Sequence, residues 1–121
     1  QVYVNNGVMD LMWQQRSADV FLGLPYDIAM YGLLLEMLAK GSNLIPGQLI
    51  GQLGDCHLYN NHLEQAKEYL SRPRRVMPSL KLHDGLSIGY SARVYIPDAK
   101  DIELIKYNPL PAIKAPLSVG N

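Results

Sequence analysis

The alternation of apolar and polar residues at the start of the chain predicts a β-hairpin. Two runs rich in strand-forming residues, Gln1 to Val4 and Val8 to Gln15, flank Asn5-Asn6-Gly7. Asparagine and glycine readily adopt the positive φ values that a tight hairpin turn requires. A polar stretch from Arg16 to Asp19 follows the second run, and we expect the strand to end where this stretch begins.

The strongest helical pattern runs from Pro25 to Lys40. Proline suits the first helical position, and Gly41 suits the stop. The residues of this segment are apolar on nearly every side, which predicts a helix that is buried over most of its surface. The helix is too short for a membrane span, and it carries Asp27, Glu36 and Lys40.

The rest of the chain predicts several shorter elements. They are a turn at Ile45-Pro46-Gly47, a bent or bulged strand within Gln48 to Tyr59, a helix from His62 to Ser71 capped by Asn60 or Asn61, a strand from Leu80 to His83, a strand-like run from Asp101 to Tyr107, and a proline-rich tail from Pro109 to Asn121. The region from Asp84 to Lys100 has no clear pattern. We therefore expect one α+β domain over residues 1–121, with a long buried helix packed on a sheet.

The composition is that of a globular protein without a dominant charge. The chain has 121 residues, 48% of them hydrophobic, and 11 basic against 11 acidic residues give a formal net charge of zero. This balance argues against a general binder of nucleic acids or membrane surfaces, although a local cluster of arginines still suits a small anionic ligand. The single cysteine, Cys56, excludes an internal disulfide and fits the reducing cytoplasm.

The chain begins at Gln1, directly in a strand-like run. The basic and apolar segments of a signal peptide do not precede this run, so we expect no secretion signal. We interpret the beginning as a cut through the middle of a larger protein. Processing, proteolysis or the design of the expressed chain would each produce it.

Two pairs of polar residues are candidates for a ligand site. Arg16 and Ser17 place a guanidinium beside a hydroxyl, and the two can make charge-assisted contacts to a phosphate. From spacing alone, a surface arginine next to a turn serine is the better interpretation. His57 and Tyr59 are two apart on a strand, so they share one face and can bind a sugar hydroxyl together. Taken alone, this pair is better explained as core side chains with satisfied polar tips.

Three further candidates carry less weight. Cys56 and His57 are adjacent on a strand and point to opposite faces, so we expect no cysteine–histidine nucleophile, and Cys56 is interpreted as a small buried hydrophobe. His57 and His62 lack a third ligand at a recognisable spacing, so no metal site is expected. Asp27 is the third residue of the predicted helix, where a carboxylate complements the helix dipole.

The order of these features is more specific than any one of them. The segment from Gln15 to Ala29 closely resembles the thymidylate synthase signature QRSxDxxLGxPFNIA, and residues 54–62 resemble the GDxHxYxNH motif of that family. Residues 70–72 and 111–116 match two further landmarks at fitting spacings. The resemblance covers essentially the whole chain. It implies a thymidylate-synthase-like α+β fold with a mixed sheet, of which this chain is the C-terminal part.

The resemblance implies a nucleotide site. Gln15 opens the signature that binds the substrate, and Arg16 and Ser17 hold its 5′-phosphate. His57 and Tyr59 bind the 3′-hydroxyl of the deoxyribose. Each of these residues thereby acquires a function that its spacing alone does not indicate.

The resemblance also implies a folate site, with 5,10-methylenetetrahydrofolate as the co-substrate. The backbone of Asp19 faces the pyrimidine while its carboxylate meets the pterin, and Leu22 and Gly23 line the folate pocket. The C-terminal tail, including Val119, closes over the site. Because the family builds each site from two chains, we expect a homodimer that binds a pyrimidine deoxynucleotide and a folate, and neither a membrane nor a nucleic acid as a partner.

The nucleophilic cysteine of the family is not among these residues. It lies in a Pro-Cys-His motif shortly before the strand that opens this chain, and Cys56 occupies a different position. Without a thiolate to add to C6 of the pyrimidine, C5 is not activated, so we expect this polypeptide alone to be inactive. Two departures from the family pattern are Gln14, in place of a frequent tyrosine, and a tail that continues to Asn121, which bears on how the site excludes water.

Asp27 stands where thymidylate synthases have asparagine. An asparagine amide donates to uracil O4, whereas a carboxylate accepts from the cytosine amine and repels O4, a mismatch that costs on the order of 1–3 kcal/mol. The deoxycytidylate hydroxymethylases of the family, known from phages, have aspartate here. We therefore expect a dCMP hydroxymethylase, in the host cytoplasm if phage-encoded. The alternatives are a thymidylate synthase that acts on dUMP and a non-catalytic truncated protein.

Overall fold

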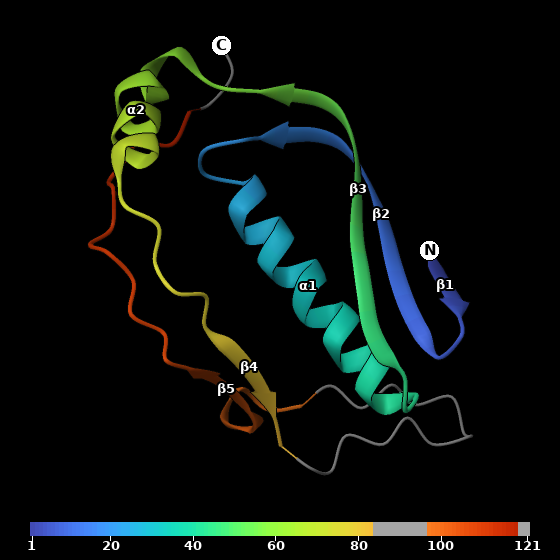
Figure 1. The fold of residues 1–121 in the computed structure, drawn as a ribbon. Coiled ribbons are helices and arrows are strands. Elements are labelled where there is room, and N and C mark those ends of the chain that lie inside the picture. The colour runs from blue at the N-terminus through green and yellow to red at the C-terminus, as the bar shows by residue number, and fades with distance from the viewer. Residues whose placement is uncertain (84–96, 119–121) are drawn as a thin grey trace.

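The computed structural model describes residues 1–83 and 97–118 of the chain (Figure 1). Within these ranges the elements are, in chain order, β1 (Val2–Asn5), β2 (Val8–Asp19), α1 (Leu24–Gly41), β3 (Ile45–His57), the 3-10 turn η1 (Asn60–His62), α2 (Leu63–Ser71), β4 (Ser79–Leu82), the 3-10 turn η2 (Ala99–Asp101) and β5 (Ile102–Ile105). The predicted α+β class is confirmed. Helix α1 lies along one face of the sheet formed by β1, β2 and β3, while α2 and the β4–β5 pair lie on the other side of α1.

The predicted hairpin is present at the start of the chain. β1 pairs antiparallel with β2, and the turn residues Asn6 and Gly7 have φ values of 49° and 78°. The expectation that the second strand ends before Arg16 is wrong, because β2 continues to Asp19. The polar end of β2 stays extended because it pairs with β3, a partner that lies far along the chain.

The three-stranded sheet has the order β1-β2-β3, and β2 runs parallel to β3. The expectation of a turn at Ile45–Gly47 is wrong: β3 already begins at Ile45, which pairs with Val8. A bulge is present, but it lies near the start of β3, earlier than Gly51 and Gly54, where the register is regular. The register passes from Met9–Pro46 to Leu11–Leu49, so β3 holds one extra residue there.

Helix α1 is one residue longer at each end than predicted, and Pro25 lies in its first turn. Its C-terminal half contributes Leu35 and Ala39 to the core, where they pack with Met9 and Leu11 of β2. The buried side chains of β2 alternate with half-buried ones as far as Trp13, as expected for a strand with one face on a helix.

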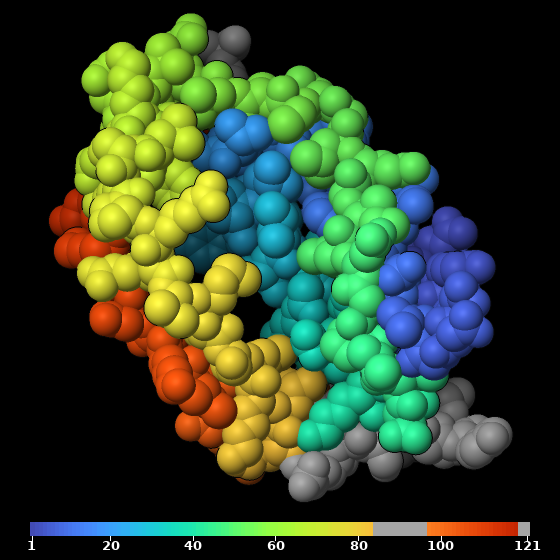
Figure 2. Space-filling view, viewed as in Figure 1, coloured from blue at the N-terminus to red at the C-terminus, as the bar shows by residue number. Residues whose placement is uncertain are grey.

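The expectation that α1 is buried on most of its surface is wrong for its N-terminal half. The side chains of Tyr26, Ile28 and Met30 are 78%, 48% and 54% exposed. Among the described residues, only the sheet covers α1 along its length, and Figure 2 shows an opening between α1 and the segment that joins α2 to β4. An apolar helix periodicity does not tell how much of the helix a given chain covers.

The remaining predicted elements are confirmed with small changes. Helix α2 begins one residue later than predicted, after η1, and neither Asn60 nor Asn61 caps it through its side chain. β4 and β5 pair antiparallel, and Lys40 of α1 donates to the carbonyl of Leu82 at the end of β4. The predicted irregular region Asp84 to Lys100 lies mostly outside the described residues. No helix in the described part of the chain is long and apolar enough to cross a membrane.

Candidate functional site

The parallel strands β2 and β3 end side by side, and most of the predicted site residues lie at these ends. Asp19, the last residue of β2, pairs in register with His57, the last residue of β3. Helix α1 begins five residues after Asp19. The carboxyl ends of parallel strands are a common place for ligands in proteins, because the connecting loops and helix starts meet there.

Asp19 organises the loop from β2 to α1. Its Oδ1 accepts hydrogen bonds from the backbone N–H groups of Phe21 (3.0 Å) and Leu22 (3.4 Å). Its carbonyl accepts from the N–H of Gly23 at 3.1 Å, and a Cβ on Gly23 would lie only 3.3 Å from that carbonyl oxygen. The predicted folate residues Asp19, Leu22 and Gly23 therefore form one tight turn, in which short aspartate side chains are favoured.

Gln15 and Asp27 are brought together across this loop. Gln15 Nε2 donates to Asp27 Oδ2 at 2.7 Å and to the backbone carbonyl of Ser17 at 3.0 Å. Gln15 Oε1 accepts from the indole N–H of Trp13 at 3.1 Å. Trp13 is thereby a further candidate residue of the site, one that the sequence motifs did not indicate. A usable signal was its spacing, since residues two apart on a strand share a face.

Arg16 and Ser17 do not share a face. Both lie within β2, where successive side chains point to opposite sides, and Arg16 is exposed while Ser17 is half-buried. The side chain of Arg16 makes no hydrogen bond or ion pair to the described residues, and it borders a shallow hollow with Gln52 and Gly54 of β3. A Cβ on Gly54 would lie 2.8 Å from the carbonyl oxygen of Arg16, so glycine permits this close approach of the two strands.

His57 and Tyr59 are adjacent, as their spacing predicts. Their rings pack edge to face with centroids 5.0 Å apart. His57 Nδ1 lies 3.1 Å from the carbonyl oxygen of Asp55, which can only accept, so Nδ1 carries a hydrogen. In the neutral imidazole, Nε2 is then an acceptor that suits a hydroxyl group.

His62 links the site to the C-terminal tail and was also missed as a site residue. Its side chain is fully buried, and Nε2 lies 2.7 Å from the carbonyl oxygen of Pro116. The rings of Phe21 and Tyr59 lie 5.5 and 5.8 Å from the imidazole. The tail is held a second time by Ser118 Oγ, which donates to Asn61 Oδ1 at 2.8 Å. Val119, the tail residue predicted for the folate site, lies outside the described residues.

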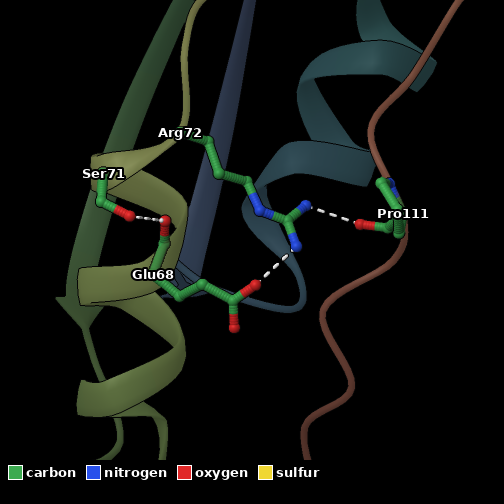
Figure 3. A network of polar contacts seen from close by, with 4 residues as sticks. All are labelled: Glu68, Ser71, Arg72 and Pro111. Atoms are coloured by element: carbon green, nitrogen blue, oxygen red, sulfur yellow. Dashed lines mark hydrogen bonds and ion pairs between the residues drawn. The ribbon is translucent and has the colours of Figure 1, made fainter.

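A second connection between α2 and the tail lies farther from the site (Figure 3). The guanidinium of Arg72 donates to the carbonyl of Pro111 and to Glu68 Oε1, both at 2.6 Å. The two landmarks at residues 70–72 and 111–116 are therefore in contact. An arginine fork suits two acceptors held at fixed positions.

The interpretation of Cys56 as a buried hydrophobe is wrong, because its side chain is exposed. The cause is the position of β3 at the edge of the three-stranded sheet, where no element of the described residues covers Cys56. Within residues 1–83 and 97–118, no three His, Cys, Asp or Glu side chains are grouped to hold a metal ion.

Comparison with known proteins assigns the family. The family model described as thymidylate synthase matches residues 1–119. This chain belongs to the thymidylate synthase family. The thymidylate synthase of Listeria monocytogenes serotype 4a (strain HCC23) is 48% identical over 119 residues, which are 98% of this chain and 36% of that protein.

Two other thymidylate synthases show how much of a family member this chain represents. Those of Corynebacterium aurimucosum (strain ATCC 700975 / DSM 44827 / CIP 107346 / CN-1) and Francisella tularensis subsp. holarctica (strain FTNF002-00 / FTA) are each 46% identical over 98% of this chain and 42% of their own length. The chain thus spans 36% to 42% of these relatives. The family resemblance of the motifs is confirmed, and so is the thymidylate-synthase-like α+β fold.

Proposed function

We propose that this thymidylate-synthase-family chain forms the part of an enzyme that binds dUMP for one-carbon transfer to C5 of its base. The observation that carries the proposal is the register of the two parallel strands. It sets Asp19 opposite His57, at the end of the sheet where α1 begins. The names of the relatives support dUMP as the nucleotide, and thus the alternative to the dCMP hydroxymethylase that Asp27 suggested.

The nucleotide is bound by groups from both strand ends. The exposed guanidinium of Arg16 binds the 5′-phosphate. β1 pairs with β2 only as far as Leu11, so the edge of β2 is unpaired at Arg16 and Ser17. At this edge the Ser17 hydroxyl, although it lies on the other face of β2, also contacts the phosphate. The acceptor Nε2 of His57, with the phenol of Tyr59 beside it, takes the 3′-hydroxyl of the deoxyribose.

The loop after β2 is suited to a folate. Asp19 uses Oδ1 for the turn, and Oδ2 has no hydrogen bond to the described residues, so this oxygen is available to the N–H groups of a pterin edge. Leu22 and Gly23 are half-buried beside it and provide apolar lining. Bound 5,10-methylenetetrahydrofolate supplies the one-carbon unit. The tail is held at Pro116 and Ser118 by His62 and Asn61, and we propose that it contributes to covering the site.

A second candidate is hydroxymethylation of dCMP, and Asp27 favours it. Position 27 presents a carboxylate, and Gln15 occupies one of its oxygens, Oδ2, as a donor. The remaining oxygen is an acceptor, which suits the exocyclic amine of cytosine better than O4 of uracil. The two nucleotides therefore have to be compared directly.

The complete reaction needs groups that these 121 residues do not contain. The only cysteine, Cys56, lies in β3 and follows Asp55, so the chain contains no Pro-Cys-His sequence. We propose that the nucleophile belongs to the remaining part of a family member, that two copies complete the site, and that this chain alone is inactive. Tritium release from a C5-tritiated nucleotide by the isolated chain would contradict the last point.

The experiment that tests the site is a titration of the chain with dUMP and dCMP, followed by NMR shifts or calorimetry. We expect dUMP to bind, and His57→Ala to weaken its binding about 2- to 10-fold through the loss of one hydrogen bond. The matched ligand control is 2′,3′-dideoxyuridine 5′-monophosphate, which lacks the 3′-hydroxyl. Its affinity is expected to be the same for the chain and the variant. Tighter binding of dCMP favours the second candidate, and no binding of either nucleotide contradicts the proposal.

A further inference from the structure

The indole of Trp13 is held rigidly between the sheet and α1. Its side chain is only 8% exposed and stacks on Tyr31 of α1, with ring centroids 5.0 Å apart and planes inclined by 18°. On the neighbouring strand it faces Gly51, where a Cβ would lie 2.5 Å from the six-membered ring. Gly51 therefore provides the space that the indole fills, and the ring has little freedom to turn.

A rigid indole determines how the Gln15 amide is oriented. The indole nitrogen can only donate, so the Gln15 atom at 3.1 Å from it has to be the carbonyl oxygen. The amide nitrogen then faces the other way, and its two hydrogens are both used, on Asp27 Oδ2 and on the carbonyl of Ser17. Trp13 and Ser17 thus enforce the same orientation of Gln15 from two sides.

We propose that Trp13 is a positioning residue for recognition of the pyrimidine base, acting through Gln15 on position 27. Gln15 always offers a donor to position 27, so whatever residue stands there must turn an acceptor towards Gln15. Asp27 does so with one oxygen and keeps the second as an acceptor for the base. The inference rests on the proposed pyrimidine site and deepens it, because it assigns the hydrogen-bond polarity at position 27 to a residue outside the signature.

The hydrogen bonds from Trp13 to Gln15 and from Gln15 to position 27 form a relay, and this relay predicts what an asparagine would do at position 27. Its Oδ1 has to accept from Gln15, so its NH₂ group is left for the base and favours uracil O4. If the indole N–H is removed, only the Ser17 carbonyl still holds the Gln15 amide in this orientation. The two amides then turn together in a larger fraction of the molecules, and asparagine offers an oxygen to the base in that fraction. Asp27 presents an oxygen to the base whichever way its carboxylate is turned. Removal of the indole N–H of Trp13 therefore has little influence on which base is preferred when position 27 is aspartate.

The first experiment tests the relay without any nucleotide. Because the chain has one tryptophan, it gives one indole N–H signal in a ¹⁵N spectrum. We expect slow hydrogen exchange at this group, and exchange at least about 3-fold faster in Gln15→Leu, which removes the acceptor. Tyr31→Phe keeps the stacked ring and serves as the control, with unchanged exchange. Equal exchange in the chain and in Gln15→Leu overturns the relay.

The second experiment measures the ratio of the dUMP and dCMP affinities in four proteins by NMR titration. They are the chain, Trp13→Phe, Asp27→Asn and the double variant, and Trp13→Phe retains the ring that stacks on Tyr31. We expect Asp27→Asn to shift the ratio towards dUMP about 10-fold, and Trp13→Phe to reverse about 3-fold or more of this shift in the double variant. In the Asp27 background, Trp13→Phe is expected to change the ratio by less than about 2-fold.

The outcomes separate this inference from the proposed function. If the nucleotides bind and the double variant keeps the full preference of Asp27→Asn, the role of Trp13 is overturned while the nucleotide site stands. If neither nucleotide binds the unmodified chain, the proposed function fails and the role in base recognition fails with it, even where the exchange experiment shows the indole hydrogen bond. A chemical-shift dispersion like that of the unmodified chain verifies that each variant is folded.

Discussion

The imidazole of His62 is fully buried and joined to the C-terminal tail through Nε2, which lies 2.7 Å from the carbonyl oxygen of Pro116. A carbonyl can only accept, so Nε2 carries the hydrogen. Nδ1 has no partner among the described residues, which leaves one buried polar atom unsatisfied. At Pro116 the tail is therefore held by a hydrogen bond from a buried side chain that cannot easily exchange it for water.

Replacement of His62 by phenylalanine is expected to release the tail. The new ring retains the packing against Phe21 and Tyr59, but the Pro116 carbonyl loses its donor, at a cost of about 1–2 kcal/mol. Limited proteolysis and hydrogen exchange of residues 111–118 measure the release. Ser118→Ala removes only an exposed hydrogen bond and is expected to have a smaller effect. Equal protection of the tail in His62→Phe and in the unmodified chain would contradict the prediction.

Gly51 and Gly32 are expected to respond to alanine in opposite directions. A Cβ at Gly51 would lie 2.5 Å from the Trp13 ring, so Gly51→Ala overpacks the contact and lowers the free energy of unfolding by about 1–3 kcal/mol. A Cβ at Gly32, inside α1, would lie 3.9 Å from the nearest atom, a methyl carbon of Leu49. Gly32→Ala is therefore expected to raise the free energy of unfolding by about 0.5–1 kcal/mol. Urea denaturation of both variants measures the two changes. An unchanged free energy of unfolding in Gly51→Ala falsifies the close approach of Gly51 to the Trp13 ring.

The thiol of Cys56 is expected to react readily in the native chain. It is exposed at the edge strand, so a disulfide reagent such as 5,5′-dithiobis(2-nitrobenzoate) should label one thiol per chain. The rate is expected to lie within about 10-fold of that in urea, because the native fold does not shield the sulfur. Cys56→Ser provides the blank. A labelling rate limited by unfolding of the chain would show that Cys56 is covered in the native state.

Arg72 is expected to hold residues 106–118 against α2. Arg72→Ala removes the hydrogen bonds to Pro111 and Glu68 and should destabilise the chain by about 1 kcal/mol, a modest figure because Glu68 is half exposed to solvent. Faster cleavage of this segment by a protease is the measurement. Arg74→Ala, at an exposed neighbour on the same segment, is the matched control with unchanged stability. A similar response of the two variants would argue against the bridge.

Much of the fold follows from local sequence signals. The Asn-Gly turn needs two residues with positive φ, and Pro25 and Gly41 mark a helix that is apolar over its length, so the hairpin and α1 are predictable. The extent of β2 and β3 is not. The polar run after Gln15 and the Ile45-Pro46-Gly47 segment have the composition of a loop or turn, and each is extended because it pairs with the other strand.

The candidate site shows the same division. The order of the motifs identified the family, and the spacing of His57 and Tyr59 placed their rings together. The contacts of Trp13 with Gln15, of Gln15 with Asp27 and of His62 with Pro116 came only from the structure. The last two of these join residues that are 12 and 54 positions apart.

The sequence by itself therefore determined the family, the class of fold and the residue types at the proposed nucleotide site. The tertiary structure decided which of these side chains meet, which way the Gln15 amide faces and that Cys56 is exposed. The physical reason is the range of the interactions. Turn and helix preferences act over a few neighbouring residues, whereas strand pairing, burial and side-chain hydrogen bonds depend on segments that become neighbours only when the chain folds.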